Sequence, residues 1–319
     1  MNHNRIERGT SSSRLVSPDP IAHLLPRSLQ PFISTSHPAS LLLFDRGLSF
    51  QTASWKGKPF LLIDDAGIFF LPAPPPWSIP DAAHPLSETL FYPDFWNCLS
   101  RTLQEWNGGI AGRLDSLPTG LRAQGFVTPE KTDTEYILHQ TQWNTLQGRA
   151  FRNHRWERNR LFRNHPEIST AHWNTSYRLS AGKLIERFFS YRSTRSNDPY
   201  ARLLLEDQYR AHEKALNHAE ELGLTGLVLL SGMDVIAITW FALIPEECSA
   251  ICFLEARNPE LTGVSTFFTQ EFFRLFPRFL RLNIQGGSGI INLEQAKKFD
   301  SPQACSPIHS QSLSSAKRS

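Results

Sequence analysis

The sequence feature that most constrains the fold is a run of three apolar segments in the second half of the chain. These segments cover residues 226–230, 235–244 and 249–255. They have the lengths of strands, and they are separated by Ser231-Gly232-Met233-Asp234 and Pro245-Glu246-Glu247, which are typical turn sequences. The pattern therefore predicts three consecutive antiparallel strands.

Further elements are expected on both sides of these strands. They are a helix over 201–222 that ends at Gly223, a phenylalanine-rich helix over 263–276, a strand over 278–284, a glycine loop over 285–289 and a closing helix over 290–299. Glycine suits the position after a helix because it adopts the left-handed conformation without strain. This order predicts an α/β fold in which helices cover an antiparallel-rich sheet.

The first half of the chain shows a weaker pattern. Apolar segments at 59–63 and 68–71 flank Asp64-Asp65-Ala66-Gly67, which indicates a hairpin. Helices are expected over 86–106 and, as the longest candidate, over 136–164, where Pro166 follows. We expect disordered segments at 1–35 and 304–319, and two folded parts at 36–165 and 166–303, the first ending in the long basic helix.

The charge of the chain is concentrated in one short segment. The 319 residues carry a formal net charge of +3, from 33 Lys and Arg against 30 Asp and Glu. Removing residues 149–163 leaves 27 bases against 29 acids, because this segment contains one acid, Glu157, and six arginines: Arg149, Arg152, Arg155, Arg158, Arg160 and Arg163. The distribution excludes a generally basic protein and favours a local polyanion-binding surface. The alternative is a solvated helix face that pairs with acids such as Glu130, Asp133 or Glu135.

Several other classes of protein do not fit the sequence. The four cysteines match neither a disulfide scaffold nor a zinc module, and His212, Glu213 and His218 lack metalloprotease spacing. Ser288 does not lie in a nucleophile elbow. The N-terminal residues 1–27 contain no apolar run like that of a secretory signal, and the longest apolar stretch, 235–244, is about half the length of a membrane span. We therefore expect a soluble cytoplasmic protein without a bound metal.

The order of elements resembles the core of the GNAT acyltransferase fold, and several motifs resemble one family more closely. These motifs are Tyr136, Leu146-Gln147-Gly148-Arg149, His154-Arg155-Trp156 with Asn159, Leu161 and Pro166, Glu221 to Gly226, Glu255 with Gly263, and Asn283 with Gly289, Leu293, Ala296 and Lys297. Through them the chain is similar to the C-terminal domain of phosphatidylglycerol lysyltransferases. The resemblance extends over roughly residues 40–302.

The resemblance implies two tandem GNAT-like halves that move an aminoacyl group from aminoacyl-tRNA to a lipid headgroup or another small acceptor. The implied catalytic residues are Glu255, which holds an α-amine or acts as a base, and Asn283. The implied substrate-binding residues are Tyr136, Gly289 and Lys297, and the implied tRNA-binding residues are Arg149, Arg152, Arg155, Arg158 and Arg163. No cofactor is implied, acetyl-CoA is not expected as a donor, and a peripheral contact with membranes is compatible with a lipid acceptor.

The sequence departs from the family pattern at three places. His154-Arg155-Trp156 replaces Lys-Arg-Asn, Gly287 stands where an acid is usual, and Glu294 stands where an arginine is usual. Two alternatives therefore stay open: a non-catalytic RNA- or anion-binding descendant of the fold, and an acyl-CoA-dependent N-acyltransferase. The loop Gln285-Gly286-Gly287-Ser288-Gly289 is either an anion site before a helix or a plain connection, and it does not match the pyrophosphate loop of acyl-CoA users.

Overall fold

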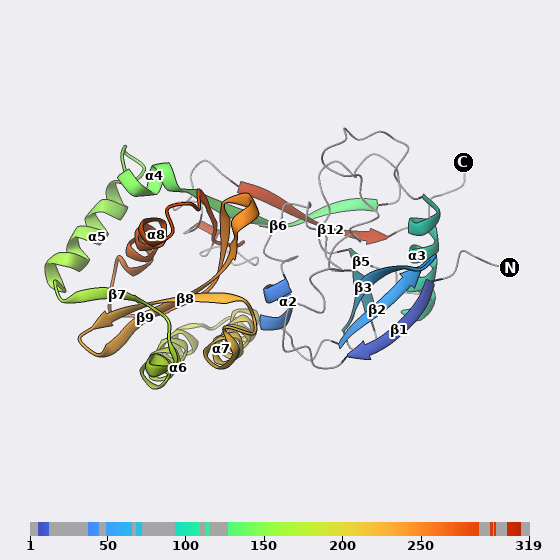
Figure 1. Ribbon diagram of the computed structural model, residues 1–319, viewed down its shortest axis with the longest axis horizontal. Helices are drawn as coiled ribbons and strands as arrows, with labels where there is room; N and C mark the ends of the chain where they lie inside the picture. The colour runs from blue at the N-terminus through green and yellow to red at the C-terminus, as the bar shows by residue number, and fades with distance from the viewer. Residues whose placement is uncertain are drawn as a thin grey trace. The chain divides into compact units, whose positions relative to one another are not determined.

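The structure of the chain is a computed structural model, which divides into two compact units. The described residues are 6–12, 38–44, 49–65, 68–71, 93–108, 113–114, 127–286, 294–295, 297 and 305–313. Unit 1 comprises Met1–Asp133 and Pro307–Ser319, and unit 2 comprises Thr134–Ser306. Figure 1 shows the helices and strands of both units.

Unit 1 contains a sheet with the strand order β1-β2-β3-β4-β5-β12. The strands are β1 (Ile6–Ser12), β2 (Ser49–Trp55), β3 (Lys58–Asp65), β4 (Ile68–Leu71), β5 (Arg113–Leu114) and β12 (Cys305–Leu313), and the helices are α2 (Pro38–Leu43) and α3 (Pro93–Trp106). The predicted hairpin is confirmed, because β3 and β4 pair in antiparallel register from Asp65–Ile68 to Ile63–Phe70. Phe95 of α3 packs edge-on against Trp55 and Phe60, which join the helix to the sheet.

Unit 2 contains a sheet with the strand order β6-β11-β10-β9-β8-β7. The strands are β6 (Val127–His139, of which 134–139 lie in this unit), β7 (Ile168–His172), β8 (Leu224–Ser231), β9 (Asp234–Ile244), β10 (Ser249–Arg257) and β11 (Arg281–Asn283). Neighbouring strands are antiparallel except for β10 and β11, which are parallel. The three predicted consecutive antiparallel strands are therefore confirmed as β8, β9 and β10.

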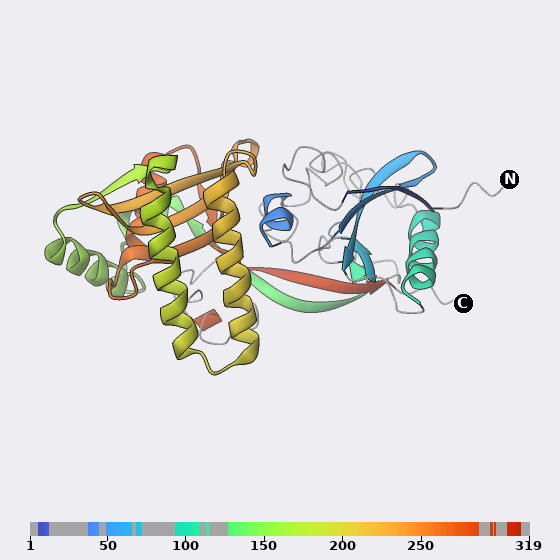
Figure 2. The same cartoon turned by 90° about the horizontal axis from the view of Figure 1, so that it is seen from below.

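Helices cover both faces of this sheet, as the sequence predicted (Figures 1 and 2). The helices are α4 (Gln140–Thr145), α5 (Arg152–Asn164), α6 (Arg178–Arg195), α7 (Pro199–His218) and α8 (Val264–Leu275). Helices α6 and α7 lie on one face, and α8 lies on the other with α4 and α5. Phe267, Phe268 and Phe272 of α8 are buried in the core between this helix and the sheet, because burying large aromatic side chains is strongly favourable.

The predicted helix over 136–164 is wrong at its beginning. Residues 135–138 are all buried and belong to β6, where Leu138 pairs with Leu282 of β11. Burial of consecutive residues is typical of a strand covered on both faces, whereas a helix exposes part of every turn. The helical part is also divided, because Leu146 (φ 48°) and Gly148 (φ 90°) take the left-handed conformation between α4 and α5.

Several elements lie where the sequence predicted none. Strands β1 and β12 fall in the two segments expected to be disordered, and β5, β7 and α6 fall between predicted elements. The boundary between the units, at Asp133, also differs from the expected division after residue 165, so the arginine helix α5 belongs to unit 2. Its backbone there approaches α8 so closely that a side chain on Gly263 would meet the Glu157 carbonyl at 2.6 Å.

Candidate functional site

The candidate site lies where β10 and β11 stop pairing. The parallel register runs from Ser249–Arg281 to Ile251–Asn283, and β10 then continues to Arg257, paired with β9 but no longer with β11. The pairing of β10 with β9 also shifts between Cys252 and Leu254, which is a β-bulge. Bulges bend a strand and redirect its side chains. The second half of β10 therefore presents its side chains beyond the end of β11.

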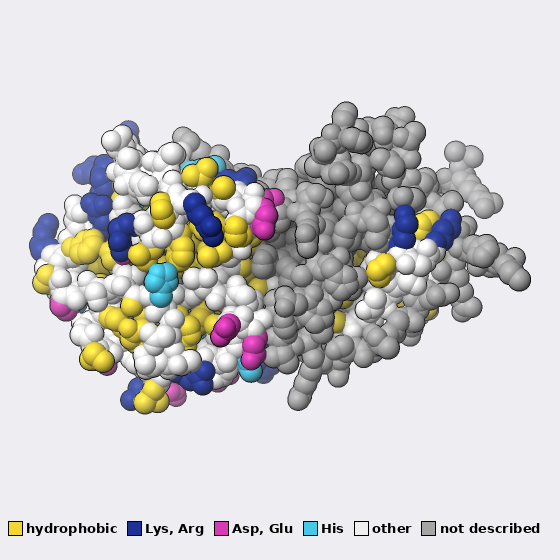
Figure 3. Space-filling view, viewed as in Figure 1, with side chains coloured by type: hydrophobic (Ala, Val, Ile, Leu, Met, Phe, Trp, Pro, Cys, Tyr) yellow, Lys and Arg dark blue, Asp and Glu magenta, His cyan; other side chains and the backbone are white. Residues whose placement is uncertain are grey.

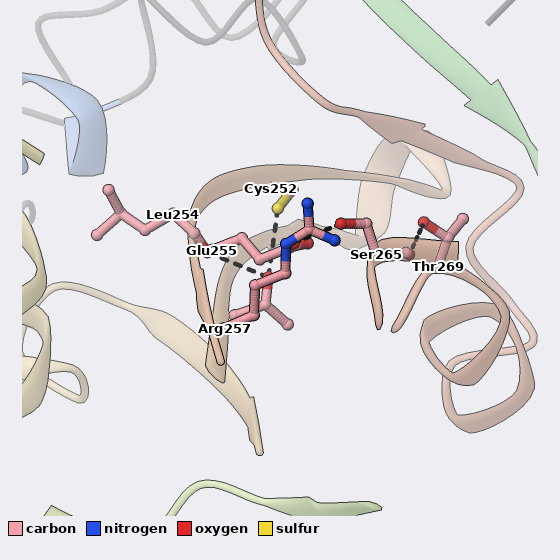
Figure 4. Close-up of polar contacts among 7 residues, drawn as sticks. Cys252, Leu254, Glu255, Arg257, Ser265 and Thr269 are labelled. Atoms are coloured by element: carbon pink, nitrogen blue, oxygen red, sulfur yellow. Dashed lines mark hydrogen bonds and ion pairs between the residues drawn. The ribbon is translucent and has the colours of Figure 1, made fainter. Parts of the chain in front are cut away.

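Glu255 lies on this part of β10 and has a fixed orientation. The Ser265 hydroxyl donates a hydrogen bond of 2.5 Å to Oε1 of Glu255, and Arg257 Nε lies 3.9 Å from the same oxygen. Figure 4 shows both side chains pointing toward the carboxylate. Ser265 belongs to the first turn of α8, whose N-terminal end favours a negative charge. The Glu255 side chain is 27% exposed, so it is not sealed off from solvent.

Cys252 lies in the same region but does not have the properties of a nucleophile. Burial raises the pKa of the Cys252 thiol to about 12, and the hydrogen bond with Thr239 and the nearby Lys297 oppose this shift only partly. Thr239 Oγ1 lies 3.3 Å from Cys252 Sγ and donates to the Leu254 carbonyl at 3.1 Å. Because the thiolate is the reactive form, this cysteine stays protonated and serves packing.

Asn283, at the end of β11, joins two strands and the loop that follows. Its Nδ2 donates to Oε2 of Glu135 at 2.7 Å, and its Oδ1 accepts from the Gln285 backbone N–H at 2.7 Å. Both Asn283 and Glu135 are buried, and Gln285 has a positive φ of 62°. The amide therefore holds the chain in the turn where the glycine loop begins.

Lys297 and Tyr136 contact the same turn. The Lys297 ammonium donates to the carbonyls of Ile284 (2.5 Å) and Gly286 (2.6 Å). The Tyr136 backbone pairs with both sides of the turn, since its N–H donates to the Gln285 carbonyl and its carbonyl accepts from Ile284. The structure thus brings together Tyr136, Asn283 and Lys297, whereas Gly289 lies outside the described residues.

Two residues of this region were not among the predicted site residues. Ser265 lies ten positions after Glu255, across a loop, so only the fold brings the two together. Glu135 was named as an acid that could pair with the arginines of residues 149–163, but it is fully buried.

Helix α5 divides its arginines between two faces. Arg155 donates to the Leu146 and Gly148 carbonyls, which closes the end of α4, and Arg158 donates to Oε1 of Gln270 on α8 at 3.3 Å. His154 is buried, with Nδ1 3.0 Å from the Thr266 hydroxyl. Arg155 and Arg158 were predicted to bind tRNA, but these contacts assign them at least a structural role.

The other face of α5 is exposed and basic. Steps of three and four residues place Arg152, Trp156, Arg160 and Arg163 on one side, which we call the α5 stripe. Trp156 is 58% exposed, and the Arg160 guanidinium lies 5.2 Å from the centre of its ring. Figure 3 shows Lys and Arg side chains gathered where α5 lies in Figure 1. Arg160 was absent from the predicted tRNA-binding residues, although its spacing from Trp156 could have identified it.

Among the described residues, no arginine between 149 and 163 forms an ion pair. Pairing with Glu135 is excluded, because that carboxylate is buried against Asn283. Uncompensated positive charge on an exposed helix face attracts a polyanion. The stripe therefore keeps the properties of an anion-binding surface, together with Arg149, which is exposed in the turn before the helix.

A buried histidine supports Glu255 from the other face of the sheet. Burial lowers the pKa of His212 to about 3, and a hydrogen bond with the Glu255 backbone opposes this shift. The ring packs edge-on against Phe189 of α6 at 5.6 Å. Within the part of the chain that is described, Nδ1 of His212 has no hydrogen-bond partner. The neutral imidazole therefore connects α7 to the strand that carries Glu255.

Neither a metal cluster nor a membrane-spanning helix occurs among the described residues. No group of three or more His, Cys, Asp or Glu side chains there could hold a metal ion. In the same residues, every helix is too short or too polar to cross a bilayer.

The order of elements is that of a GNAT-like fold: antiparallel strands lead into a parallel pair that separates, and a helix follows the strand that bears Glu255. The chain belongs to the family described as phosphatidylglycerol lysyltransferase, C-terminal, which it matches over residues 110–294. This result confirms the resemblance found in the motifs. No curated protein matches the chain in sequence.

Solved structures support the tandem GNAT-like fold. A conserved protein of unknown function from Bacteroides thetaiotaomicron is 17% identical, with a TM-score of 0.69 and coverage of 95% of this chain and 99% of that one. The C-terminal domain of a protein assigned as a lysylphosphatidylglycerol synthetase from Agrobacterium fabrum is 12% identical, with a TM-score of 0.58 and coverage of 93% of this chain and 91% of that one. L-PGS from Bacillus licheniformis is 10% identical, with a TM-score of 0.52 and coverage of 85% of this chain and 82% of that one.

Proposed function

We propose that this protein is an aminoacyltransferase that moves an aminoacyl group from aminoacyl-tRNA to a lipid headgroup or another small acceptor. The observation that carries the proposal is the Glu255 carboxylate, oriented by Ser265 at the point where β10 leaves β11. The family membership and the lysylphosphatidylglycerol synthetase names among the structural neighbours support the reaction class.

In the proposed reaction, the acceptor hydroxyl or amine attacks the ester carbonyl of the aminoacyl-tRNA. A bond forms between the acceptor atom and the carbonyl carbon, and the bond from that carbon to the terminal ribose oxygen breaks. Glu255 accepts the proton of the acceptor and returns it to the ribose oxygen. Because the ester is already activated, the remaining contribution of the protein is positioning and stabilisation of the oxyanion.

The turn at residues 284–286 and its partners Asn283 and Lys297 would shape the substrate site. Asn283 and Lys297 hold the turn at 284–286 in place, so their proposed role is to position the backbone and the loop that follows. Backbone N–H groups in such a loop are suitable donors to a developing oxyanion. The reaction needs no cofactor, and acetyl-CoA is not the proposed donor.

The α5 stripe would dock the tRNA. Arginines bind phosphates without regard to sequence, and the exposed Trp156 ring can stack on a base. Aminoacyl-tRNA is made in the cytoplasm, so the proposal places the protein in that compartment.

The test supplies purified protein with aminoacyl-tRNAs that carry labelled amino acids and with a lipid extract. The proposal predicts transfer of label to a lipid or small acceptor, at a rate above spontaneous ester hydrolysis. If no aminoacyl-tRNA is consumed with any extract, the proposal is wrong.

A second candidate is a non-catalytic RNA-binding descendant of the fold. The observation that favours it is the α5 stripe, which lacks acidic partners among the described residues and would bind RNA whether or not the site is active. Tight, salt-sensitive tRNA binding without any transfer would support this candidate.

A further inference from the structure

The helices α6 and α7 form a projecting hairpin whose end differs from the rest of the unit 2 surface. Both helices run across the strands rather than along them, and the turn between them lies beyond the strands that they cover (Figures 1 and 2). The first turn of α6 stays close to β9, since the Ser180 hydroxyl accepts a hydrogen bond from Val235 N–H at 2.9 Å. The far end of the hairpin is therefore the C-terminal end of α6 and the N-terminal end of α7.

The turn at this end is well ordered by its own hydrogen bonds. Oδ1 of Asp198 accepts from the Tyr200 backbone N–H at 2.9 Å, which caps α7. Arg202 Nε donates to the Ser196 carbonyl at 2.8 Å. The end of the hairpin thus presents its side chains on a fixed backbone.

Apolar and basic side chains are combined at this end, which we call the hairpin tip: Tyr191, Arg192, Arg195, Tyr200, Arg202 and Leu203. Tyr200 is 53% exposed and Leu203 is 51% exposed, and one helical turn separates them. The Arg195 guanidinium lies 4.2 Å from the centre of the Tyr191 ring. Among the described residues, none of the three arginines forms an ion pair. An exposed apolar pair with arginines around it is typical of a surface that enters an interface.

We propose that the hairpin tip docks on the surface of an anionic phospholipid bilayer. Tyrosine and leucine enter the boundary between headgroups and acyl chains, while arginines extend their charge to the lipid phosphates. Each arginine close to an anionic surface strengthens this attraction. The exposed Tyr200 and Leu203 distinguish the tip from the α5 stripe, where three arginines with a single tryptophan suit a nucleic acid better.

The inference rests on the proposed function for its biological meaning. A tip that contacts a bilayer would keep unit 2 at the membrane that contains the proposed lipid acceptors. The hairpin covers the face of the sheet opposite to α8, whose Ser265 contacts Glu255 (Figures 1 and 2).

The test is co-sedimentation of the full chain with vesicles of phosphatidylcholine alone and of phosphatidylcholine mixed with phosphatidylglycerol, without tRNA. The test variant is Tyr200→Ser with Leu203→Ser. One control is Met233→Ser, which removes a side chain that is 87% exposed on the β8–β9 turn. A second control, Arg152→Gln with Arg160→Gln, weakens the α5 stripe. Circular dichroism and thermal unfolding establish that each variant is folded.

We expect the wild type and both controls to bind the anionic vesicles, and the test variant to bind them at least about tenfold more weakly. The inference is overturned if binding does not depend on the anionic lipid, or if only the α5 variant loses it. It is also overturned if the test variant changes a concentration-dependent self-association or RNA binding instead. An assay of aminoacyl transfer to a water-soluble acceptor separates membrane docking from the proposed function. The test variant should retain this transfer activity. If the wild type shows no such transfer, the result counts against the proposed function and not against membrane docking.

Discussion

The Ser265 hydroxyl donates a 2.5 Å hydrogen bond to Glu255 and so connects the first turn of α8 to the strand β10. A short bond from a helix N-terminus to a carboxylate fixes which oxygen stays available to a substrate. Oε1 is occupied by Ser265 and approached by Arg257, which leaves Oε2 as the proposed base.

Replacing Ser265 tests this relationship. We expect Ser265→Ala to lower kcat of the transfer reaction by about tenfold, with a smaller effect on KM, because an unfixed carboxylate still accepts a proton but is less well positioned. Ser265→Thr keeps the hydroxyl and should restore most of the rate. Equal losses in both variants would indicate a packing role for this side chain rather than a positioning one.

The two faces of α5 should respond differently to mutation. Arg155→Gln removes the hydrogen bonds to the Leu146 and Gly148 carbonyls and should lower the free energy of unfolding by about 1–2 kcal/mol. Arg152→Gln with Arg160→Gln should leave stability unchanged and reduce both the tRNA affinity and its salt dependence. Thermal unfolding and filter binding at several salt concentrations measure the two effects. A stripe variant that binds tRNA as tightly as the wild type would contradict the docking role.

Gly263 tests the close contact between α5 and α8. It has a φ of 84°, and an added Cβ would lie 2.6 Å from the Glu157 carbonyl. We expect Gly263→Ala to destabilise the protein by about 3 kcal/mol or more. The matched control is Gly232→Ala, at a φ of 62° with no atom within 4 Å of the added Cβ, which should cost only about 1 kcal/mol of backbone strain. If both variants lose the same free energy of unfolding in denaturant, α5 and α8 can move apart at Gly263 without cost.

His212 should make the protein sensitive to acid. Its pKa is about 3 in the folded state, against an ordinary value of 6.5, so the unfolded chain binds the additional proton between these values. The contribution of His212 to the free energy of unfolding is fully present above about pH 6.5 and is lost as the pH falls toward 3. The free energy of unfolding should fall by about 2 kcal/mol between pH 6.5 and 4.5 for this reason. His212→Phe removes this contribution. Urea unfolding at several pH values should therefore show a smaller loss for the variant, and parallel curves would contradict the assignment.

The elements that the sequence predicted correctly are those whose pattern is local. The strands β8, β9 and β10 are separated by turn residues, and α8 carries its phenylalanines at helical spacing. Helix α6 was missed although Ala181, Leu184, Ile185, Phe188 and Phe189 have the same spacing. Strand β6 was misread because Ile137 and Leu138, with Trp143 and Leu146 farther on, imitate a buried helical stripe. Only the pairing with β11 distinguishes the two cases.

The candidate site was predicted in part for the same reason. The motifs pointed to Asn283, Lys297 and Glu255, but the partners that define their roles come from distant segments. Glu135 lies 148 residues before Asn283, and Ser265 reaches Glu255 only through the loop between β10 and α8. The inward turn of Arg155 and Arg158 depends on the carbonyls at the end of α4 and on Gln270, which no pattern of charges reveals.

The measurement that tests the proposed function most directly is a single-turnover assay of aminoacyl transfer by Glu255→Gln. The matched control is Glu220→Gln, which changes an exposed glutamate in the turn after α7. We expect Glu255→Gln to transfer the aminoacyl group at least about 100-fold more slowly than the wild type while binding tRNA equally well. We expect the control to match the wild type. Transfer by Glu255→Gln at the wild-type rate would contradict the assignment of this carboxylate as the base.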